Sequence, residues 1–347
     1  MNTHSNEISV RLKNIKCNFG LTTVIDNLSL DISKGEIVSL VGRSGCGKST
    51  LLRIIAGVQA VNGGSVELGG EMVDGFSFIE PEHRSVGLVF QDYALFPHLN
   101  VRDNVLFGLR HQARRGGHEI VTTILQRVGI EHLAERFPHS LSGGEQQRTA
   151  LARALAPEPA ILLMDEPFSN LDQGLKERVR AETLSLLRGL GATVIMVTHD
   201  PHEALSLGDR VVLMRSGKIV QSADPRHLYH RPNSAYAADF FCPSAKVQGE
   251  ARNGFIETAL GRFVRPACEV EDGPCILFIR PHAIRICDEF DGLRARIIDR
   301  AFLGDRERLT LRFDGIAETM VADVTEPLPA DLGHVRAKIV SERLLVF

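Results

Sequence analysis

The chain has 347 residues, of which 44% are hydrophobic and 24% charged, and its 40 basic and 43 acidic side chains give a formal net charge of -3. This composition excludes a disordered or fibrous protein, and the length predicts two domains. Nucleic acid is not expected as a partner, because no basic field would attract a polyanion. No apolar stretch reaches the roughly 18 residues that a membrane-spanning helix needs.

The N-terminus and the cysteines indicate the compartment. The segment Met1 to Val10 is polar and lacks the apolar core of a secretory signal. The six cysteines form no C-x-x-C pair and no regular framework, which predicts free thiols in a reducing cytosol. Buried thiols are expected at the three cysteines within residues 243–347, which are Cys268, Cys275 and Cys287.

Strand-like and helix-like segments alternate along residues 1–242. Apolar runs predict strands at 36–41, 86–90, 161–164 and 193–198, and helical spacing predicts helices at 48–56, 145–156 and 175–188. Such alternation is typical of an α/β layer with a largely parallel sheet. Residues 243–347 instead contain short β-like runs separated by Gly, Pro and Asp, which predicts a small all-β domain joined to the first by a helix at 234–241.

A glycine-rich loop follows the first of these strands and opens a helix. Residues 42–49 match G-x-x-x-x-G-K-[ST] at every fixed position, and this context disfavours an ordinary glycine turn. Lys48 can reach the β- and γ-phosphates of a nucleotide, and the Ser49 hydroxyl can bind Mg²⁺. The nucleotide-binding residues expected here are Gly42, Arg43, Ser44, Gly45, Cys46, Gly47, Lys48, Ser49 and Thr50.

Two adjacent acids end the apolar strand at 161–164. A buried strand is not expected to end in Asp165 and Glu166 without a partner, because unpaired buried charge is costly. Asp165 suits the Mg²⁺ shell, and Glu166 suits the general base that orients an attacking water. The alternative is a strand end that meets solvent, where acids are harmless.

The segment Leu141-Ser142-Gly143-Gly144-Glu145 precedes a predicted helix. Ser142 and Glu145 fit a capping box, so a plain helix start is the simple interpretation. Two glycines at a helix N-terminus also expose N–H groups to an anion. A second phosphate-binding element within one chain makes sense if it serves the nucleotide of another copy.

With these motifs in this order, residues 8–240 resemble the ATP-binding subunits of ABC transporters. The further landmarks are Gln91, the run Ser169-Asn170-Leu171-Asp172, and His199. The resemblance implies an α/β P-loop NTPase domain over residues 1–242, with a helical subdomain at about 92–157. It implies ATP and Mg²⁺ as cofactors, and a homodimer that holds two ATP molecules between its copies.

The resemblance also implies roles for single residues. Lys48, Gln91, Glu166 and His199 would be catalytic, with His199 on the γ-phosphate and Gln91 on Mg²⁺ or the attacking water. The Mg²⁺ ligands would be Ser49, Gln91 and Asp165. Phe19 would stack on adenine, and the alternative is a core phenylalanine. Plain polar strand ends are the alternative for Gln91 and His199.

The second copy would contribute the remaining contacts. Asp172 would couple the two nucleotide sites, and nucleotide contact would come from Ser142, Gly143, Gly144 and Glu145. Glu145 stands where the family usually has Gln, and Asn170 stands where it usually has Ala. Phosphate contact is expected to survive the first change, since the Ser and both Gly remain, and the second is expected to be tolerated.

Residues 243–347 resemble the small OB-like β domains appended to many importer ATPases. The resemblance lies in the turn Ile279-Arg280-Pro281-His282 and in the run 301–305. Regulation and dimerisation are both open as roles of this domain. The importer resemblance implies integral membrane permease subunits as partners, a solute-binding protein acting indirectly, and a peripheral location at the cytoplasmic face of the inner membrane. Residues 93–105 would lie beside the groove that receives a permease helix, with core packing as the alternative.

The transported solute is the least specified part of the interpretation. The chain most resembles ferric-ion import ATPases, and importers of polyamines, sulfate, phosphonates or sugars share most of the same motifs. A soluble ABC ATPase outside transport is the alternative class. Such proteins usually have two cassettes or a long coiled-coil insertion, and this sequence shows neither.

Overall fold

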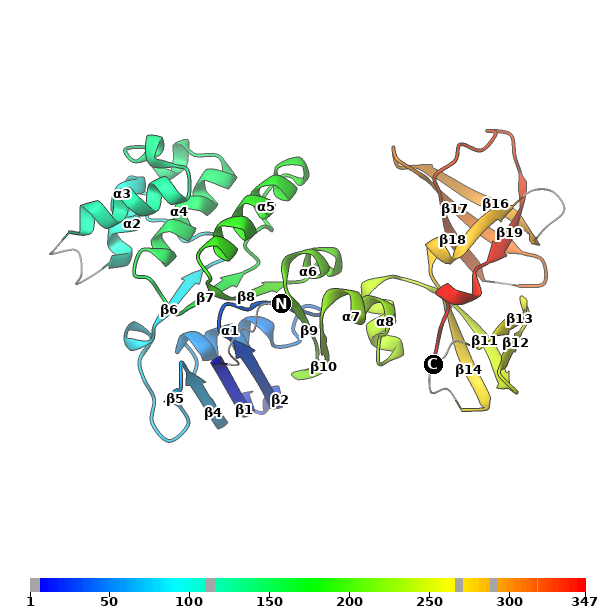
Figure 1. Cartoon of the computed structure of the whole chain (residues 1–347), viewed down its shortest axis with the longest axis horizontal. Coiled ribbons are helices and arrows are strands. Elements are labelled where there is room, and N and C mark those ends of the chain that lie inside the picture. Colours follow the sequence, from blue (N-terminus) through cyan, green and yellow to red (C-terminus); the bar gives the residue numbers. More distant parts are fainter. Residues whose placement is uncertain (1–6, 110–115, 266–270, 288–291, 317) are drawn as a thin grey trace. The chain divides into compact units, whose positions relative to one another are not determined.

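The computed structural model describes residues 7–109, 116–265, 271–287, 292–316 and 318–347, and these form two compact units. The first covers residues 1–231 and the second 232–347. The division falls before residue 242, because the helix α8 (Ala235–Phe241) groups with the second unit. Figure 1 shows the elements of each unit.

A mainly parallel sheet forms the centre of the first unit. Within the described residues it has six strands in the order β10-β9-β3-β8-β7-β6. Every neighbouring pair is parallel except β10 with β9. The bounds are β3 (Ile37–Val41), β6 (Val86–Val89), β7 (Ile161–Asp165), β8 (Thr193–Thr198), β9 (Arg210–Arg215) and β10 (Lys218–Ala223). The predicted parallel sheet is therefore confirmed.

The central strands separate two hydrophobic cores. Leu162 and Met164 of β7 pack in one core, and Ile161 and Leu163 pack in the other. This follows from the two-residue period of a strand, and both faces are apolar because both are covered. Packing on both faces of the sheet therefore fixes the position of the C-terminal end of β7.

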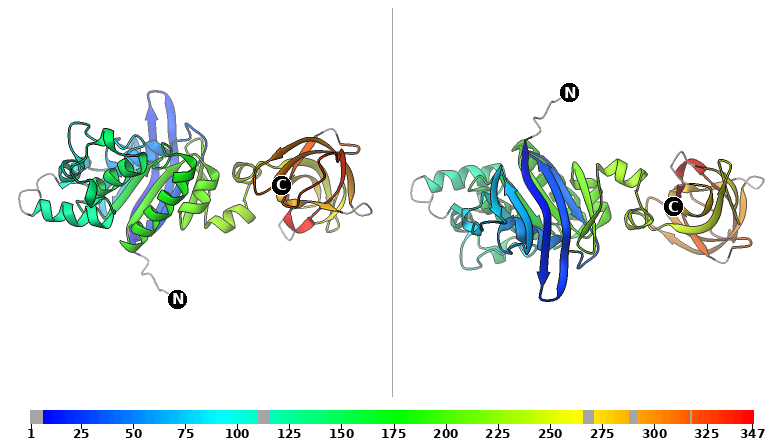
Figure 2. Two further views of the ribbon diagram at one scale, coloured as in Figure 1. Left: turned by 90° about the horizontal axis from the view of Figure 1, so that it is seen from above. Right: turned by 90° about the horizontal axis from the view of Figure 1, so that it is seen from below.

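A second, antiparallel sheet was not expected from the sequence. In the described part of the chain its order is β2-β1-β4-β5, with the bounds β1 (Ile8–Phe19), β2 (Thr22–Ser33), β4 (Gly63–Leu68) and β5 (Glu71–Asp74). Figure 2 shows β1 and β2 as a long pair of strands, and the tip of this pair holds Phe19.

Helices pack around the sheets of the first unit. The predicted helix after the glycine-rich loop is confirmed with its bounds unchanged, as α1. The described residues between 101 and 155 include three helices that share a core with β7. The bounds are α1 (Lys48–Ala56), α2 (Val101–Leu109), α3 (Gly117–Arg127), α4 (Gly143–Leu155), α5 (Gln173–Gly189), α6 (Pro201–Leu207) and α7 (Pro225–His230).

Where the structure describes it, the second unit is all-β apart from α8 and short turns, as predicted. Among described residues it has two five-stranded antiparallel sheets, β13-β12-β11-β14-β20 and β15-β19-β16-β17-β18. Seen end-on in Figure 2, the strands curl around one core. The bounds are β11 (Ala245–Arg252), β12 (Phe255–Thr258), β13 (Gly261–Val264), β14 (Gly273–Ile279), β15 (Ile284–Cys287), β16 (Leu293–Phe302), β17 (Glu307–Phe313), β18 (Thr319–Val324), β19 (His334–Ile339) and β20 (Leu345–Val346).

The described cysteines are free thiols, as expected, and their burial differs from the expectation at one position. Cys275 is buried, and burial raises the pKa of its thiol. Cys287 is only partly buried, because it is the last residue of β15, an edge strand of its sheet. Cys268 lies outside the described residues.

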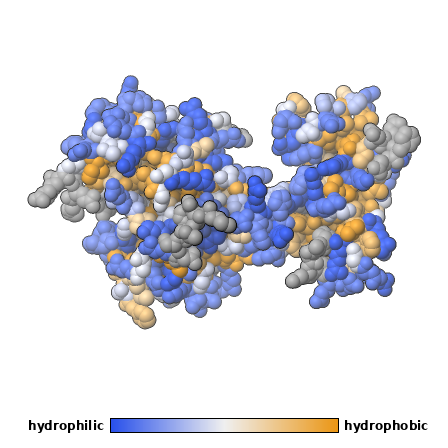
Figure 3. Space-filling model, viewed as in Figure 1, coloured by the Kyte–Doolittle hydropathy of each residue, from blue (hydrophilic) through white to orange (hydrophobic). Residues whose placement is uncertain are grey.

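Hydrophilic side chains dominate the face shown in Figure 3, with apolar patches between them. None of the helices in the described ranges is both long and apolar enough to span a membrane.

Candidate nucleotide site

The glycine-rich loop connects β3 to α1. A Cβ on Gly42 would lie 2.4 Å from the backbone oxygen of Met214, so no larger residue fits there. Gly47 has φ of 104°, which favours glycine. Lys48 is buried and donates to the backbone oxygens of Gly42 at 2.8 Å and Arg43 at 3.2 Å. The amine is therefore held across the mouth of the loop, where a phosphate would lie.

The first acid contacts the first residues of α1. Ser49 Oγ donates to Asp165 Oδ1 at 3.2 Å. Burial raises the pKa of Asp165, the Ser49 bond opposes that shift, and the neighbouring Glu166 adds to it. A hydroxyl and a carboxylate in contact beside a phosphate loop are hard oxygen ligands of the type that Mg²⁺ takes, so these residues fit that ion.

The second acid lies at the centre of a polar cluster. Glu166 has a positive φ of 46°, a strained value for a residue with a side chain. Its Oε2 accepts a long hydrogen bond of 3.4 Å from Gln91 Nε2 and lies 2.9 Å from His199 Nδ1. Three residues that were expected to be catalytic, each from the end of a different strand, are thus brought together.

The loop after Glu166 is tied back to this cluster. Ser169 Oγ donates to the backbone oxygen of Glu166 at 2.9 Å, and Asn170 Nδ2 donates to that of Gln91 at 2.9 Å. Asn170 therefore holds the backbone of a cluster residue, a role that sequence reasoning missed. Asp172 is exposed at the N-cap position of α5.

Ser142 is the N-cap residue of α4 and forms the predicted capping box with Glu145. Its N–H and its hydroxyl both donate to Glu145 Oε2, at 2.7 Å and 2.8 Å, and these bonds lower the pKa of Glu145. A Cβ on Gly143 would lie 3.1 Å from Leu171, and one on Gly144 would lie 3.2 Å from Val179. The segment therefore packs against the loop that precedes α5 and against α5 itself.

Comparisons with known proteins identify this arrangement. A profile described as ABC transporter matches residues 25–169, and one described as TOBE domain matches residues 277–345. The Fe(3+) ions import ATP-binding protein of Streptomyces avermitilis is 42% identical, over 91% of this chain and 92% of that protein. The sulfate/thiosulfate import ATP-binding protein of Chromobacterium violaceum is also 42% identical, over 86% and 82%. The chain belongs to the ATP-binding subunits of ABC importers.

Two solved structures of ABC ATPases are similar to this importer ATPase in sequence and fold. A dimeric ATP-binding cassette in a post-hydrolysis state, bound to ADP and Pi, is 32% identical with a TM-score of 0.55, over 62% of this chain and 99% of that one. The cbiO1 protein of Clostridium perfringens, part of the ABC transporter complex cbiONQ, is 28% identical with a TM-score of 0.59, over 64% and 90%. The importer ATPase therefore hydrolyses ATP as a subunit of a transporter complex.

A buried acid that the sequence analysis missed supports the His199 segment. Glu203 of α6 accepts a hydrogen bond from the Thr198 hydroxyl, and its other oxygen lies 3.7 Å from Lys176 and 3.6 Å from Arg180. Both cations are on α5, so Glu203 joins α5 to the end of β8. In the importer ATPase, Glu203 thus holds the end of the strand that precedes His199.

Phe19 is exposed at the tip of the β1–β2 pair, where it pairs with Thr22. This position rules out the core phenylalanine that was the alternative. Phe19 is 49% exposed and its ring is not part of the core.

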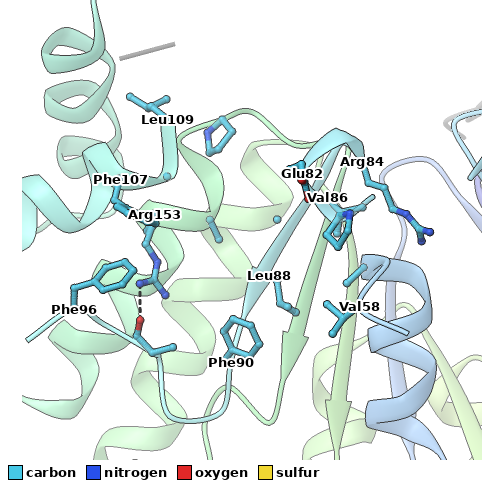
Figure 4. Close-up of a pocket in the computed structure, with 17 residues that line it drawn as sticks. Val58, Glu82, Arg84, Val86, Leu88, Phe90, Phe96, Phe107, Leu109 and Arg153 are labelled. Carbon is cyan, nitrogen blue, oxygen red and sulfur yellow. Dashed lines mark hydrogen bonds between the residues drawn. The ribbon is translucent and has the colours of Figure 1, made fainter. Parts of the chain in front are cut away.

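An apolar pocket of about 670 Å³ lies beside the Gln91 segment. Figure 4 shows Phe90, Phe96 and Phe107 around it, with the Arg153 guanidinium next to the Phe96 ring. Arg153 donates to the backbone oxygens of Tyr93 and Ala94, at 2.7 Å and 2.6 Å, where both residues have positive φ. The segment 93–105 is divided, because Tyr93, Val101 and Val105 are buried in the core whereas Ala94 and Phe96 line the pocket.

Proposed function

We propose that two copies of this importer ATPase close around two ATP molecules and that hydrolysis reopens them to drive solute uptake. The observation that supports this most strongly is the separation of the polar groups. Lys48, Asp165 and Glu166 gather where the parallel strands end, whereas the two glycines after Ser142 pack against α5 and the loop before it. One copy would therefore contribute the first set, and its partner the second.

The chemistry follows from the positions of the side chains. Glu166 would take the proton of a water as the water oxygen bonds to the γ-phosphorus. The bond from that phosphorus to the bridging oxygen breaks, leaving ADP and phosphate. The contacts of Gln91 and His199 with Glu166 would hold the carboxylate and the water in line. Lys48 would stabilise the phosphate charge.

Ser49, Asp165 and Gln91 would hold a magnesium ion, whose positive charge would offset the charge of the phosphates. The raised pKa of Asp165 supports this role, because a cation would favour the charged carboxylate that burial penalises. Phe19 would stack on adenine from the exposed tip of its strand pair.

A complementation experiment tests the shared site. Lys48→Ala removes one half-site and Ser142→Arg blocks the other, so each variant alone should be nearly inactive. A 1:1 mixture should recover about a quarter of the parent ATPase rate, since random pairing makes half of the dimers mixed, each with one intact site. Parent-level activity of Ser142→Arg alone would reject the dimer mechanism.

The apolar pocket beside Gln91 is proposed to receive a short helix of an integral membrane permease. Its apolar lining and its continuity with the Gln91 segment support this partner. The ATPase would then be peripheral, at the cytoplasmic face of the inner membrane, and a solute-binding protein would act through the permease. Phe107→Ser should abolish co-purification with the permease while basal ATPase is kept. Phe76→Ser, an exposed aromatic outside the pocket, is the matched control.

Ferric iron is the proposed solute, because several relatives at about 40% identity are named as Fe(3+) ion importers. Deletion of the gene should abolish uptake of labelled ferric iron and leave sulfate uptake unchanged. Loss of sulfate uptake instead would assign the chain with its sulfate/thiosulfate relative. The β domain, over residues 243–347, is proposed to dimerise or regulate the ATPase.

A further inference from the structure

The hydrogen bonds of Ser142 are already taken within the chain. A hydroxyl has one proton and a backbone N–H has one, and both protons of Ser142 point to the same oxygen of Glu145. For Ser142 to donate to a phosphate, these bonds must break or be shared. Any nucleotide that reaches Ser142 therefore competes with a carboxylate of this chain.

Charge strengthens that competition. The bonds from Ser142 lower the pKa of Glu145, with smaller contributions from His132 and Arg148, so the side chain is ionised at neutral pH. A negative charge at the start of α4 also interacts favourably with the dipole of this 13-residue helix. A phosphate brought to the same place meets a like charge and finds the positive end of the helix already neutralised.

We propose that Glu145 is an internal anion that raises the ATP concentration needed to close the dimer. This inference rests on the proposed function, because the competing phosphate belongs to the nucleotide held by the partner copy. Glu145 is a positioning residue that acts through Ser142. A glutamine at this position can accept the same hydrogen bonds without the charge, so Glu145→Gln separates the competition from the cap.

The test measures dimer formation against ATP concentration by analytical ultracentrifugation, in chains that carry Glu166→Gln so that ATP persists. Adding Glu145→Gln should lower the midpoint ATP concentration about three- to tenfold, the usual advantage of removing a charge from a partly exposed contact. The difference should shrink between about 50 and 500 mM salt, because salt screens exposed charges. In the chain with intact Glu166, KM for ATP should fall by a similar factor while kcat changes little.

Two controls keep the test specific. Ser142→Ala should weaken the effect of Glu145→Gln, because the competed hydroxyl is gone and only the backbone N–H remains, and melting temperatures should show that each variant folds. Dimers with the same midpoint, or with a salt-independent shift, would overturn this inference and leave the dimer mechanism standing. The absence of any ATP-dependent dimer, both with Glu145 intact and with the Glu145→Gln change, would overturn the proposed function and this inference together.

Discussion

The two parts of the candidate site are held in different ways. The residues around the phosphate loop contact one another across three strands, as in the bonds from Ser49 to Asp165 and from Gln91 to Glu166. The Ser142 segment contacts its own Glu145 and the packing surface of α5. The first part is thus organised around the place of a ligand, and the second around a helix start. In the proposed mechanism, this difference would let one copy bind the nucleotide and leave a second copy to complete the site.

The largest expected effect comes from the centre of the organised part. Glu166→Gln should lower kcat about 10²–10⁴-fold, because the amide cannot take the proton of water. Steady-state phosphate release would measure it. Glu177→Gln, an exposed acid on α5, is the matched control and should retain the parent rate. An unchanged rate in Glu166→Gln would remove this residue from the chemistry.

Glu203 and its ion pairs with α5 should contribute mainly to the stability of the fold. Glu203→Ala leaves two cations of α5 without their buried partner, and it should lower the free energy of unfolding by about 1–3 kcal/mol, discounted because both cations reach solvent. Urea denaturation would measure it. Asp239→Ala breaks the more exposed pair with Lys246 and should cost under about 1 kcal/mol. Equal losses in the two variants would contradict the buried role of Glu203.

The link between the two parts should have an intermediate effect on rate. Asn170→Asp keeps the shape of the side chain but removes the N–H that holds the Gln91 backbone. About fivefold slower ATP hydrolysis is expected, equivalent to one hydrogen bond of about 1 kcal/mol. Single-turnover kinetics would measure it. Since the bond restrains Gln91, an effect on nucleotide affinity with kcat unchanged would argue against this positioning role.

The smallest expected effect is on stability, because the partly buried carboxylate of Asp165 lowers the free energy of unfolding. Burial raises the pKa of Asp165, so its charge disfavours folding at neutral pH, and that penalty disappears as pH falls below the ordinary value of 3.8. Asp165→Asn should therefore raise Tm by about 1–3 °C at neutral pH, with the gain fading in acid. Calorimetry of the nucleotide-free chain across pH would measure it. A lower Tm at neutral pH would show that the Ser49 bond outweighs burial.

Local signals in the sequence predicted the local structure of both parts well. The glycine-rich loop, the bounds of α1, the acids at the end of β7 and the capping box at Ser142 each depend on residues close in sequence. The all-β character of the second unit was also predicted, because its strands are short and separated by turn residues.

The elements that were missed depend on distant contacts. Asn170 and Gln91 are 79 positions apart, and no local pattern marks either as a partner of the other. The antiparallel sheet was missed for a related reason. The alternation of β1 is interrupted where its pairing with β2 shifts between Leu12 and Ile15, so the period that identifies a strand is broken.

The register of β7 links folding to chemistry in a way that bears on evolution. Its alternate residues belong to different cores, and the same count along the strand decides which acid meets Ser49 and which meets His199. Inserting or deleting one residue would swap the apolar partners and displace both carboxylates in a single event. A substitution in this strand affects one position, whereas an insertion or deletion shifts every position after it. We therefore expect natural variants to conserve the length of the strand more strictly than the identities of its apolar residues.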